Sequence, residues 1–213
     1  MQIVKPQDIE LSAKPINDTQ LLTVLGVDTA FANMGFARMK LDIDTMELTL
    51  DRLRTVSTEK QTGKKKAIRQ NSDDLRRGRE LFAAIHAELE GCDVVFAEIP
   101  SGAQHARSAL GFGISLGVLA SIEKPLVEVM PVDTKLASVG TKTAEKSEVI
   151  SWAASLYPEA QWRRYAKDTP KNRAGDLHLD NEHEADAIGV VHAGIQMQTF
   201  KDLLSMWRTV RTK

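Results

Sequence analysis

The sequence predicts an α/β fold built on a five-stranded mixed sheet, and three observations support this prediction. Five stretches have the length and composition of β-strands. The first three are separated only by short polar connections, as in hairpins, whereas segments of helical periodicity lie before and after the fourth. Three strands followed by alternating helices and strands are typical of an α/β protein with a mixed sheet.

The amino-terminal part of the chain is expected to contain an irregular arm and the three hairpin-like strands. Residues 1–19 form the arm, because Pro6 and Pro15 disfavour a helix there. The strands are predicted over residues 21–27, 35–41 and 46–56, with the turn between the last two at 42–44. Residues 58–71 are basic and polar and are predicted to form a loop.

A helix is predicted to begin at Ser72, because Asp73 and Asp74 place negative charge at the positive end of the helix dipole. Gly91 is expected to end it. Its apolar side chains recur at helical spacing and are expected to face the core. They are Leu75, Phe82, Ile85 and Leu89.

The carboxyl-terminal part is expected to complete the sheet and cover it with helices. The remaining strands are predicted at residues 93–99 and 126–130. Helices are predicted at residues 106–122, 135–139, 143–156 and 184–210. Residues 157–181 form a polar excursion between the last two helices.

Length and composition predict one cytoplasmic domain, residues 20–213, after the arm. The chain of 213 residues is too short for two comfortable domains. No apolar run approaches the roughly 18 residues that a membrane span needs. The first residues lack the apolar core of a signal peptide, and the only cysteine, Cys92, cannot form an intrachain disulfide.

Positive charge is concentrated in two insertions although the net charge is −1. Residues 52–79 contain ten Lys and Arg against three acidic residues, and residues 162–173 contain five against one. Such segregation favours a polyanion-binding face, because local charge attracts phosphate. A solvated face beside loops is the alternative interpretation. The candidate phosphate-binding residues in these insertions are Lys64, Lys65, Lys66, Arg69, Arg163 and Arg164.

Three acidic residues end or flank buried elements. Asp28 ends the first strand, Glu98 ends the fourth, and Asp186 lies near the start of the last helix, three residues after His183. A carboxylate at the end of an apolar strand is costly to bury unless it binds something. Hard divalent cations prefer carboxylate oxygens, so these residues are candidate metal ligands. Alternatively, Asp28 caps a turn, Glu98 pairs with an arginine, and Asp186 is an ordinary N-terminal helix acid.

Five short motifs extend from Leu21 to Ala193. They are Val24-Leu25-Gly26-Val27-Asp28 with Gly35, Val95-Phe96-Ala97-Glu98, Ala109-Leu110-Gly111-Phe112-Gly113 with Gly117-Val118, Val132-Asp133-Thr134-Lys135 with Val139-Gly140 and Ala144-Glu145-Lys146-Ser147, and His183-x-x-Asp186-Ala187. In order and spacing this set resembles the RuvC Holliday-junction resolvases of the ribonuclease H superfamily. The chain departs from them in about 20 extra residues before Asp28, in its two insertions, and in Ser101 where the family has an aromatic wedge.

The resemblance implies a ribonuclease H-like sheet with helices on both faces and a nuclease that uses two Mg²⁺ or Mn²⁺ ions. Asp28 would bridge both ions, and Glu98, His183 and Asp186 would complete their ligands. Lys135 and Lys146 would contact the phosphates at the cleavage site, and Lys146 would belong to the catalytic set. The products would carry 5′-phosphate and 3′-hydroxyl ends.

The resemblance also implies a partner, four-way-junction DNA, and a homodimer. The dimer would form through the small residues Ala109, Gly113, Gly117 and Ser121, although this stripe could instead pack on the chain's own sheet. Phe112 and Trp162 are candidates to replace the missing wedge. The alternatives are a related nuclease that acts on flaps, nicked DNA or RNA–DNA hybrid, an RNA-processing relative, and a non-catalytic nucleic-acid-binding module.

Overall fold

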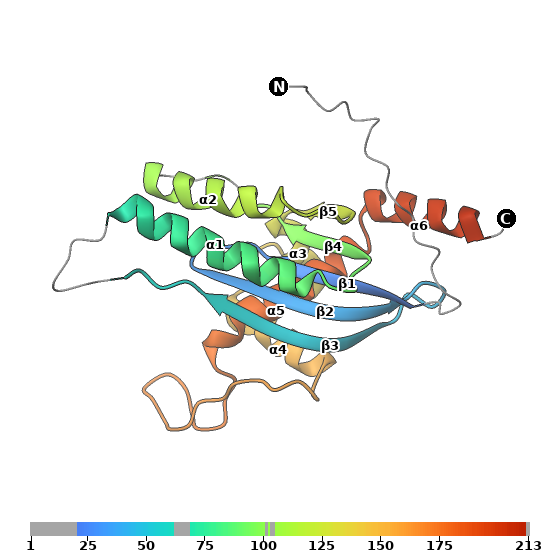
Figure 1. Cartoon of the computed structure of the whole chain (residues 1–213). Helices are drawn as coiled ribbons and strands as arrows, with labels where there is room; N and C mark the ends of the chain where they lie inside the picture. Colours follow the sequence, from blue (N-terminus) through green and yellow to red (C-terminus); the bar gives the residue numbers. More distant parts are fainter. Residues whose placement is uncertain (1–20, 62–68, 101, 103–104, 212–213) are drawn as a thin grey trace.

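A five-stranded mixed sheet forms the centre of the molecule (Figure 1). The computed structural model describes residues 21–61, 69–100, 102 and 105–211. The strands are β1 (Leu21–Asp28), β2 (Asn33–Asp42), β3 (Leu48–Ser57), β4 (Val94–Glu98) and β5 (Leu126–Val129), in the order β3-β2-β1-β4-β5. The β1–β2 and β2–β3 pairs are antiparallel, whereas β1–β4 and β4–β5 are parallel. The predicted sheet is confirmed, and β1 and β4 are adjacent with their carboxyl ends at one edge.

Helices cover both faces of the sheet, as expected. They are α1 (Gln70–Glu88), α2 (Ala106–Leu119), α3 (Pro131–Ser138), α4 (Lys146–Leu156), α5 (Glu182–Gly194) and α6 (Gln198–Arg211), with a short 3₁₀ helix, η2 (Leu179–Asn181), before α5. Leu25 and Val27 of β1 face a core shared with α1 and α2. Leu22 and Val24 face the opposite core, which α4, α5 and α6 complete. Successive side chains of β1 therefore point alternately into two separate cores.

Two glycines allow α5 to lie directly against the sheet. A Cβ added to Gly26 of β1 would lie 2.2 Å from the carbonyl oxygen of Ala187, and one added to Gly35 of β2 would lie 2.0 Å from that of His183. Both contacts are with helix backbone, so a larger residue would push α5 away. Gly35 pairs with Asp28 across the β1–β2 ladder. The first turn of α5 is consequently held over the end of β1.

The predicted core face of the first helix is partly wrong. Ile85 and Leu89 are buried, but Leu75 is 66% and Phe82 46% exposed. The buried face of the first turns instead carries charged side chains, Asp73, Asp74 and Arg77, which bind one another and neighbouring arginines. Because these ion-paired side chains occupy the buried face, Leu75 lies on the solvent-exposed side of the helix. The helix also begins at Gln70, two residues before the predicted start.

The long carboxyl-terminal helix predicted from the sequence is two helices, α5 and α6, separated at residues 195–197. Phe96 of β4 occupies the space at the end of α5, where a Cβ on Gly194 would lie 2.1 Å from its ring. Phe200 of α6 packs edge-on against the same ring, with centroids 5.2 Å apart. The chain turns so that Phe200 can reach this contact. Among the described residues, none of the helices has both the length and the apolar character needed to cross a membrane.

Candidate active site

Asp28 and Glu98 lie at neighbouring positions on one edge of the sheet. The β1–β4 ladder pairs Val27 with Ala97, and the two acids follow these residues directly. Because the strands are parallel, both carboxylates emerge at the same edge. Asp28 is buried and Glu98 is half-buried.

Helix α5 adds His183 and Asp186 to this edge. The Nδ1 atom of His183 lies 2.7 Å from Oδ2 of Asp28, a contact that joins residues 155 positions apart. Burial is the main cause that raises the pKa of Asp186 to about 8, and the charges of Asp28 and Glu98 raise it further. Asp186 therefore lies within electrostatic reach of both strand-end acids.

The carboxylates of Glu98 and Asp186 have no basic partner in the described part of the chain. The hydroxyl of Thr134 on α3 donates a 2.7 Å hydrogen bond to Oε2 of Glu98. Burial raises the pKa of Glu98 to about 7 against this hydrogen bond, and the charge of Asp28 adds to the increase. The hydrogen bond to Asp28 in turn raises the pKa of His183. Among these residues, the arginine pair considered for Glu98 does not form, and the partner of Asp28 is an imidazole.

The chemistry of this donor set fits a hard divalent cation, since three carboxylates and one imidazole supply oxygen and nitrogen ligands. Two of the carboxyls also bear the electrostatic cost of burial without a basic ion-pair partner among the described residues. As the side chains stand, however, no three His, Cys, Asp or Glu of the described ranges are grouped tightly enough to hold a metal ion. An ion would have to draw the carboxylates together.

The lysines predicted near the site occupy different positions around it. Lys135 on α3 is half-buried, and its charge acts to lower the pKa of Glu98. Lys146, the first residue of α4, is exposed, and its Nζ lies 2.5 Å from Oε1 of Glu182, which directly precedes His183. Lys135 is thus electrostatically coupled to the acids, whereas Lys146 is joined to the start of α5.

The predicted phosphate-binding residues are more dispersed. Arg69 precedes α1 and is exposed, and Lys64, Lys65 and Lys66 lie outside the described residues. Arg163 lies 3.4 Å from a carboxylate oxygen of Glu184 and donates to the carbonyl of Asp180. Arg164 donates to the carbonyl of Gly175 at 2.7 Å.

Much of the positive charge between residues 52 and 79 is neutralised within the molecule, which corrects the inference drawn from the charge count. Arg52 and Arg54 on β3 both bind the buried carboxylate of Glu88. Arg76 pairs with Asp73 and Glu80. Arg77 is buried, with its guanidinium 3.9 Å from the ring centroid of Phe31. These four arginines stabilise the fold and are not free phosphate ligands.

Trp162 cannot replace the aromatic wedge where it stands. Its side chain is 9% exposed, and its Nε1 donates to the carbonyl of Tyr157 at 2.9 Å. Phe112 on α2 is half-buried, and Ser101 lies outside the described residues. Among the described residues, the expectation for Trp162 is therefore wrong, and Phe112 is the remaining candidate.

The small-residue stripe of α2 faces solvent and does not pack on the chain's own sheet. Ala109, Gly113 and Gly117 are exposed, and a Cβ on either glycine would meet nothing within 4 Å. Leu110 and Leu116 beside them are also exposed. Ser121, at the end of the stripe, is half-buried and bonds to His86. The exposed part of the stripe is free to contact another surface.

Sequence reasoning missed two partners of the site, Thr134 and Glu182. Thr134 lies within one of the motifs, directly before Lys135, and could have been recognised as a hydroxyl donor for a carboxylate. Glu182 carries no local signal, because its pairing with Lys146 depends on how α4 and α5 approach each other. Tertiary structure alone reveals that contact.

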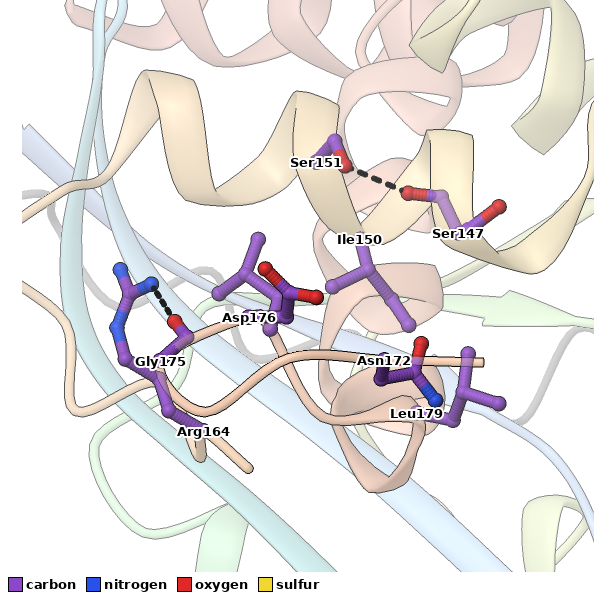
Figure 2. Close-up of a pocket in the computed structure, with 9 residues that line it drawn as sticks. Ser147, Ile150, Ser151, Arg164, Asn172, Gly175, Asp176 and Leu179 are labelled. Atoms are coloured by element: carbon purple, nitrogen blue, oxygen red, sulfur yellow. Dashed lines mark hydrogen bonds between the residues drawn. The ribbon is translucent and has the colours of Figure 1, made fainter. Parts of the chain in front are cut away.

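A separate pocket of about 420 Å³ lies between α4 and the polar excursion. Figure 2 shows Ser147, Ile150 and Ser151 on its helical side, and Arg164, Asn172 and Gly175 on the other. None of the four proposed metal ligands lines it. The pocket is therefore distinct from the edge where the carboxylates meet.

Comparison with known proteins identifies the fold. The sequence matches no protein-family model and no curated protein. The structure is similar to that of Thermus thermophilus RuvC in complex with a Holliday junction substrate, with a TM-score of 0.55 and 18% identity over 81% of this chain and 92% of that chain. A second T. thermophilus RuvC structure gives a TM-score of 0.52 and 20% identity over 82% of this chain and 95% of that one. The chain thus has the RuvC-like form of the ribonuclease H fold, as the resemblance implied.

Proposed function

We propose that this protein is a divalent-metal-dependent endonuclease that resolves four-way DNA junctions by paired, symmetric nicks. One observation carries the proposal: Asp28 and Glu98 end two adjacent parallel strands, His183 contacts Asp28, and Asp186 is electrostatically coupled to both acids. The fold adds support, because a RuvC of the same fold was solved with a Holliday junction substrate. In open α/β sheets this edge is where ligands commonly bind.

Asp28, Glu98, His183 and Asp186 would hold two Mg²⁺ or Mn²⁺ ions. When bound, such ions supply positive charge to the reacting phosphate and lower the pKa of a ligated water. The chain's own contacts prepare the ligands. The Thr134 hydroxyl fixes the orientation of Glu98. Asp28 engages Nδ1 of His183, which leaves Nε2 as the available ring nitrogen.

Basic side chains beside the acids would position the substrate. Lys135 lies close enough to Glu98 to influence its pKa, and Lys146 stands at the start of α4. We assign both to phosphates at the cleavage site. Contacts farther along the DNA would come from Lys64, Lys65, Lys66, Arg69, Arg163 and Arg164.

Paired nicking of a two-fold symmetric junction needs two active sites related by a two-fold axis, which a homodimer provides. The exposed stripe of Ala109, Gly113 and Gly117 on α2 is suited to such an interface, because small side chains permit close approach. Leu110 and Leu116 add exposed apolar area beside it. We propose this face of α2 as the dimer contact.

A second candidate is a nuclease of the same fold that cuts flaps, nicked DNA or RNA–DNA hybrid. The buried position of Trp162 favours it, because this side chain cannot stack on an unpaired base at a junction. A non-catalytic binding module is disfavoured. Carboxylates gathered beside phosphates would weaken binding unless they served a metal.

Cleavage of defined substrates tests the proposal. The wild-type chain is incubated with a four-way junction, a 5′ flap, a nicked duplex, a linear duplex and an RNA–DNA hybrid of matched sequence, each with Mg²⁺, Mn²⁺ or chelator. We expect two symmetric nicks in the junction, dependent on metal, and none by Asp28→Asn. Preferential cutting of the flap or of the RNA–DNA hybrid would favour the second candidate function. Binding without cleavage of any substrate would contradict a nuclease.

A further inference from the structure

The polar excursion folds into an ordered arch, which we define as residues 163–178. A β-bridge joins Arg164 to Leu177 near its base. The backbone amide of Tyr165 donates to the carbonyl of Asp176 at 2.9 Å, and that of Gly175 donates back to the carbonyl of Tyr165 at 2.8 Å. These reciprocal bonds hold the two limbs of the arch together. Figure 1 shows it as an open loop projecting beyond α4.

Both limbs of the arch are anchored to the body of the protein. Buried Trp162 fixes the chain just before the first limb. The fully buried side chain of Asn181 accepts from the amide of Arg163 and donates to the carbonyls of Arg163 and His178. Asn181 also ends η2, which leads directly into α5. The arch is thus tied to the helix that carries His183 and Asp186.

The acidic side chains of the arch are used internally, whereas its tip cations are not. Asp168 accepts from the amide of Ala174 at 2.8 Å, and Asp176 accepts from the amide of Arg173 at 2.7 Å. The side chains of Lys167, Lys171 and Arg173 are exposed, and within the described residues they form no ion pair or hydrogen bond. The arch therefore presents unneutralised positive charge on a fixed backbone.

The tip is also held away from the helix beneath it. The pocket of about 420 Å³ separates Ser147 and Ile150 of α4 from Asn172 and Gly175 of the arch (Figure 2). The tip therefore does not rest on α4 there. Cations presented by a preformed loop lose less conformational freedom on binding than cations on a flexible chain.

We infer that the arch is a second DNA-contact element, which binds backbone phosphates of a duplex arm beside the cleavage site through Lys167, Lys171 and Arg173. The inference rests on the proposed function. Exposed, spaced cations suit contact with phosphate, and phosphate contacts position the protein on DNA without reading its sequence. Because η2 connects the arch to α5, an arm bound there is fixed relative to the carboxylates.

The test compares two double variants of equal charge change. Lys167→Gln with Lys171→Gln alters the arch, whereas Lys124→Gln with Lys201→Gln removes two exposed lysines from the turn before β5 and from α6. Fluorescence anisotropy measures binding to a long-armed junction over a range of KCl concentrations without divalent metal. The arch variant should lower the salt slope by about one unit per lysine removed. Adding Arg173→Gln should lower it again, and the control should keep the wild-type slope.

A junction with shorter arms tests whether the arch contacts the outer part of a duplex arm. On this substrate the arch variant and the wild type should bind equally, because the arms no longer reach the tip. Equal salt slopes for the two double variants on long arms, or a difference that persists undiminished on short arms, would overturn the inference. A wild type that neither bound nor cut branched DNA would instead contradict the proposed function. Circular dichroism and thermal melts verify that each variant is folded.

Discussion

Two groups of buried or half-buried acids in this protein have opposite surroundings. On α1, each acid is paired with arginine: Glu88 binds Arg52 and Arg54, and Asp74 binds Arg107. At the carboxyl edge of β1 and β4, Asp28, Glu98 and Asp186 form no ion pair with Lys or Arg in the described ranges, and Asp28 contacts only an imidazole there.

The pKa values follow this difference. The hydrogen bond from Arg107 is the main cause that holds the pKa of Asp74 below its ordinary value. Burial instead raises the pKa of Glu98 to about 7 and that of Asp186 to about 8. An acid that is paired with a cation of the fold contributes to stability, whereas Glu98 and Asp186 bear the cost of burial without such a pair in the described ranges. Residue type and burial alone do not separate the two.

Removing a carboxylate from the site should have the largest effect. Asp186→Asn should reduce junction cleavage to the level of a protein-free control, because a proposed metal ligand is lost. The same change should raise the free energy of unfolding near pH 7 by roughly 3 kcal/mol, because a group that is costly to ionise becomes neutral. Gel assays of cleavage and urea denaturation measure the two effects. Retained cleavage would remove Asp186 from the site.

The matching change on α1 should act in the opposite direction. Asp74→Asn removes the carboxylate that binds Arg107 and lies 4.0 Å from the buried guanidinium of Arg77. Stability should fall by about 3 kcal/mol, as for other broken buried pairs, while cleavage per folded molecule stays close to wild type below the melting temperature. A more stable Asp74→Asn protein would break the distinction between the two groups of acids.

Histidines offer the same comparison. The pKa of His183 beside Asp28 is raised, whereas burial lowers that of His192, which bonds to the Tyr157 hydroxyl at 2.9 Å, to about 4. The folded protein resists protonation of His192, so its stability should decline by up to about 3 kcal/mol as pH falls from 6.5 to 4. His192→Gln should have a shallower acid limb in pH-dependent urea denaturation. Identical limbs in the two proteins would show that His192 is not responsible.

The smallest effect on stability is expected on the exposed face of α2. Gly117→Leu adds a side chain into open space, so the monomer's stability should rise by no more than about 1 kcal/mol, which comes from the higher helix propensity of leucine. Light scattering should nevertheless find a dimer for the wild type and a monomer for the variant. The variant should bind DNA but not make coordinated nicks. A monomeric wild type would favour the flap or hybrid nuclease.

Most of the fold could be predicted because β1, β4 and β5 are largely apolar, and the proximity of Asp28 to Glu98 because these acids end β1 and β4. Contacts between elements that are distant in the sequence could not be predicted in this way. The charged buried face of α1 depends on contacts outside the helix, because Arg77 lies over the ring of Phe31 and Asp74 binds Arg107. The break between α5 and α6 depends on Phe96, a residue of β4. Neither leaves a periodic signal in its own segment.

Charge counting had the same weakness. The surplus of positive charge between residues 52 and 79 predicted a phosphate-binding face, but four of its arginines bind acids or an aromatic ring within the fold. The smaller surplus at residues 162–173 includes three cations that have no such partner among the residues that the structure describes. Which charges remain free is decided by the folded neighbours of each side chain, and a count along the sequence does not contain that information.

The contact of His183 with Asp28 and Gly35 has a consequence for protein synthesis. His183 lies 155 positions after Asp28, and Asp186 follows three residues later. Chains are made from the amino terminus, and their early segments start to fold before the later ones leave the ribosome. A nascent chain that has completed the sheet still lacks two of the four proposed metal ligands. The proposed nuclease activity would therefore require nearly the whole chain to be translated, because shorter fragments lack two of the proposed ligands.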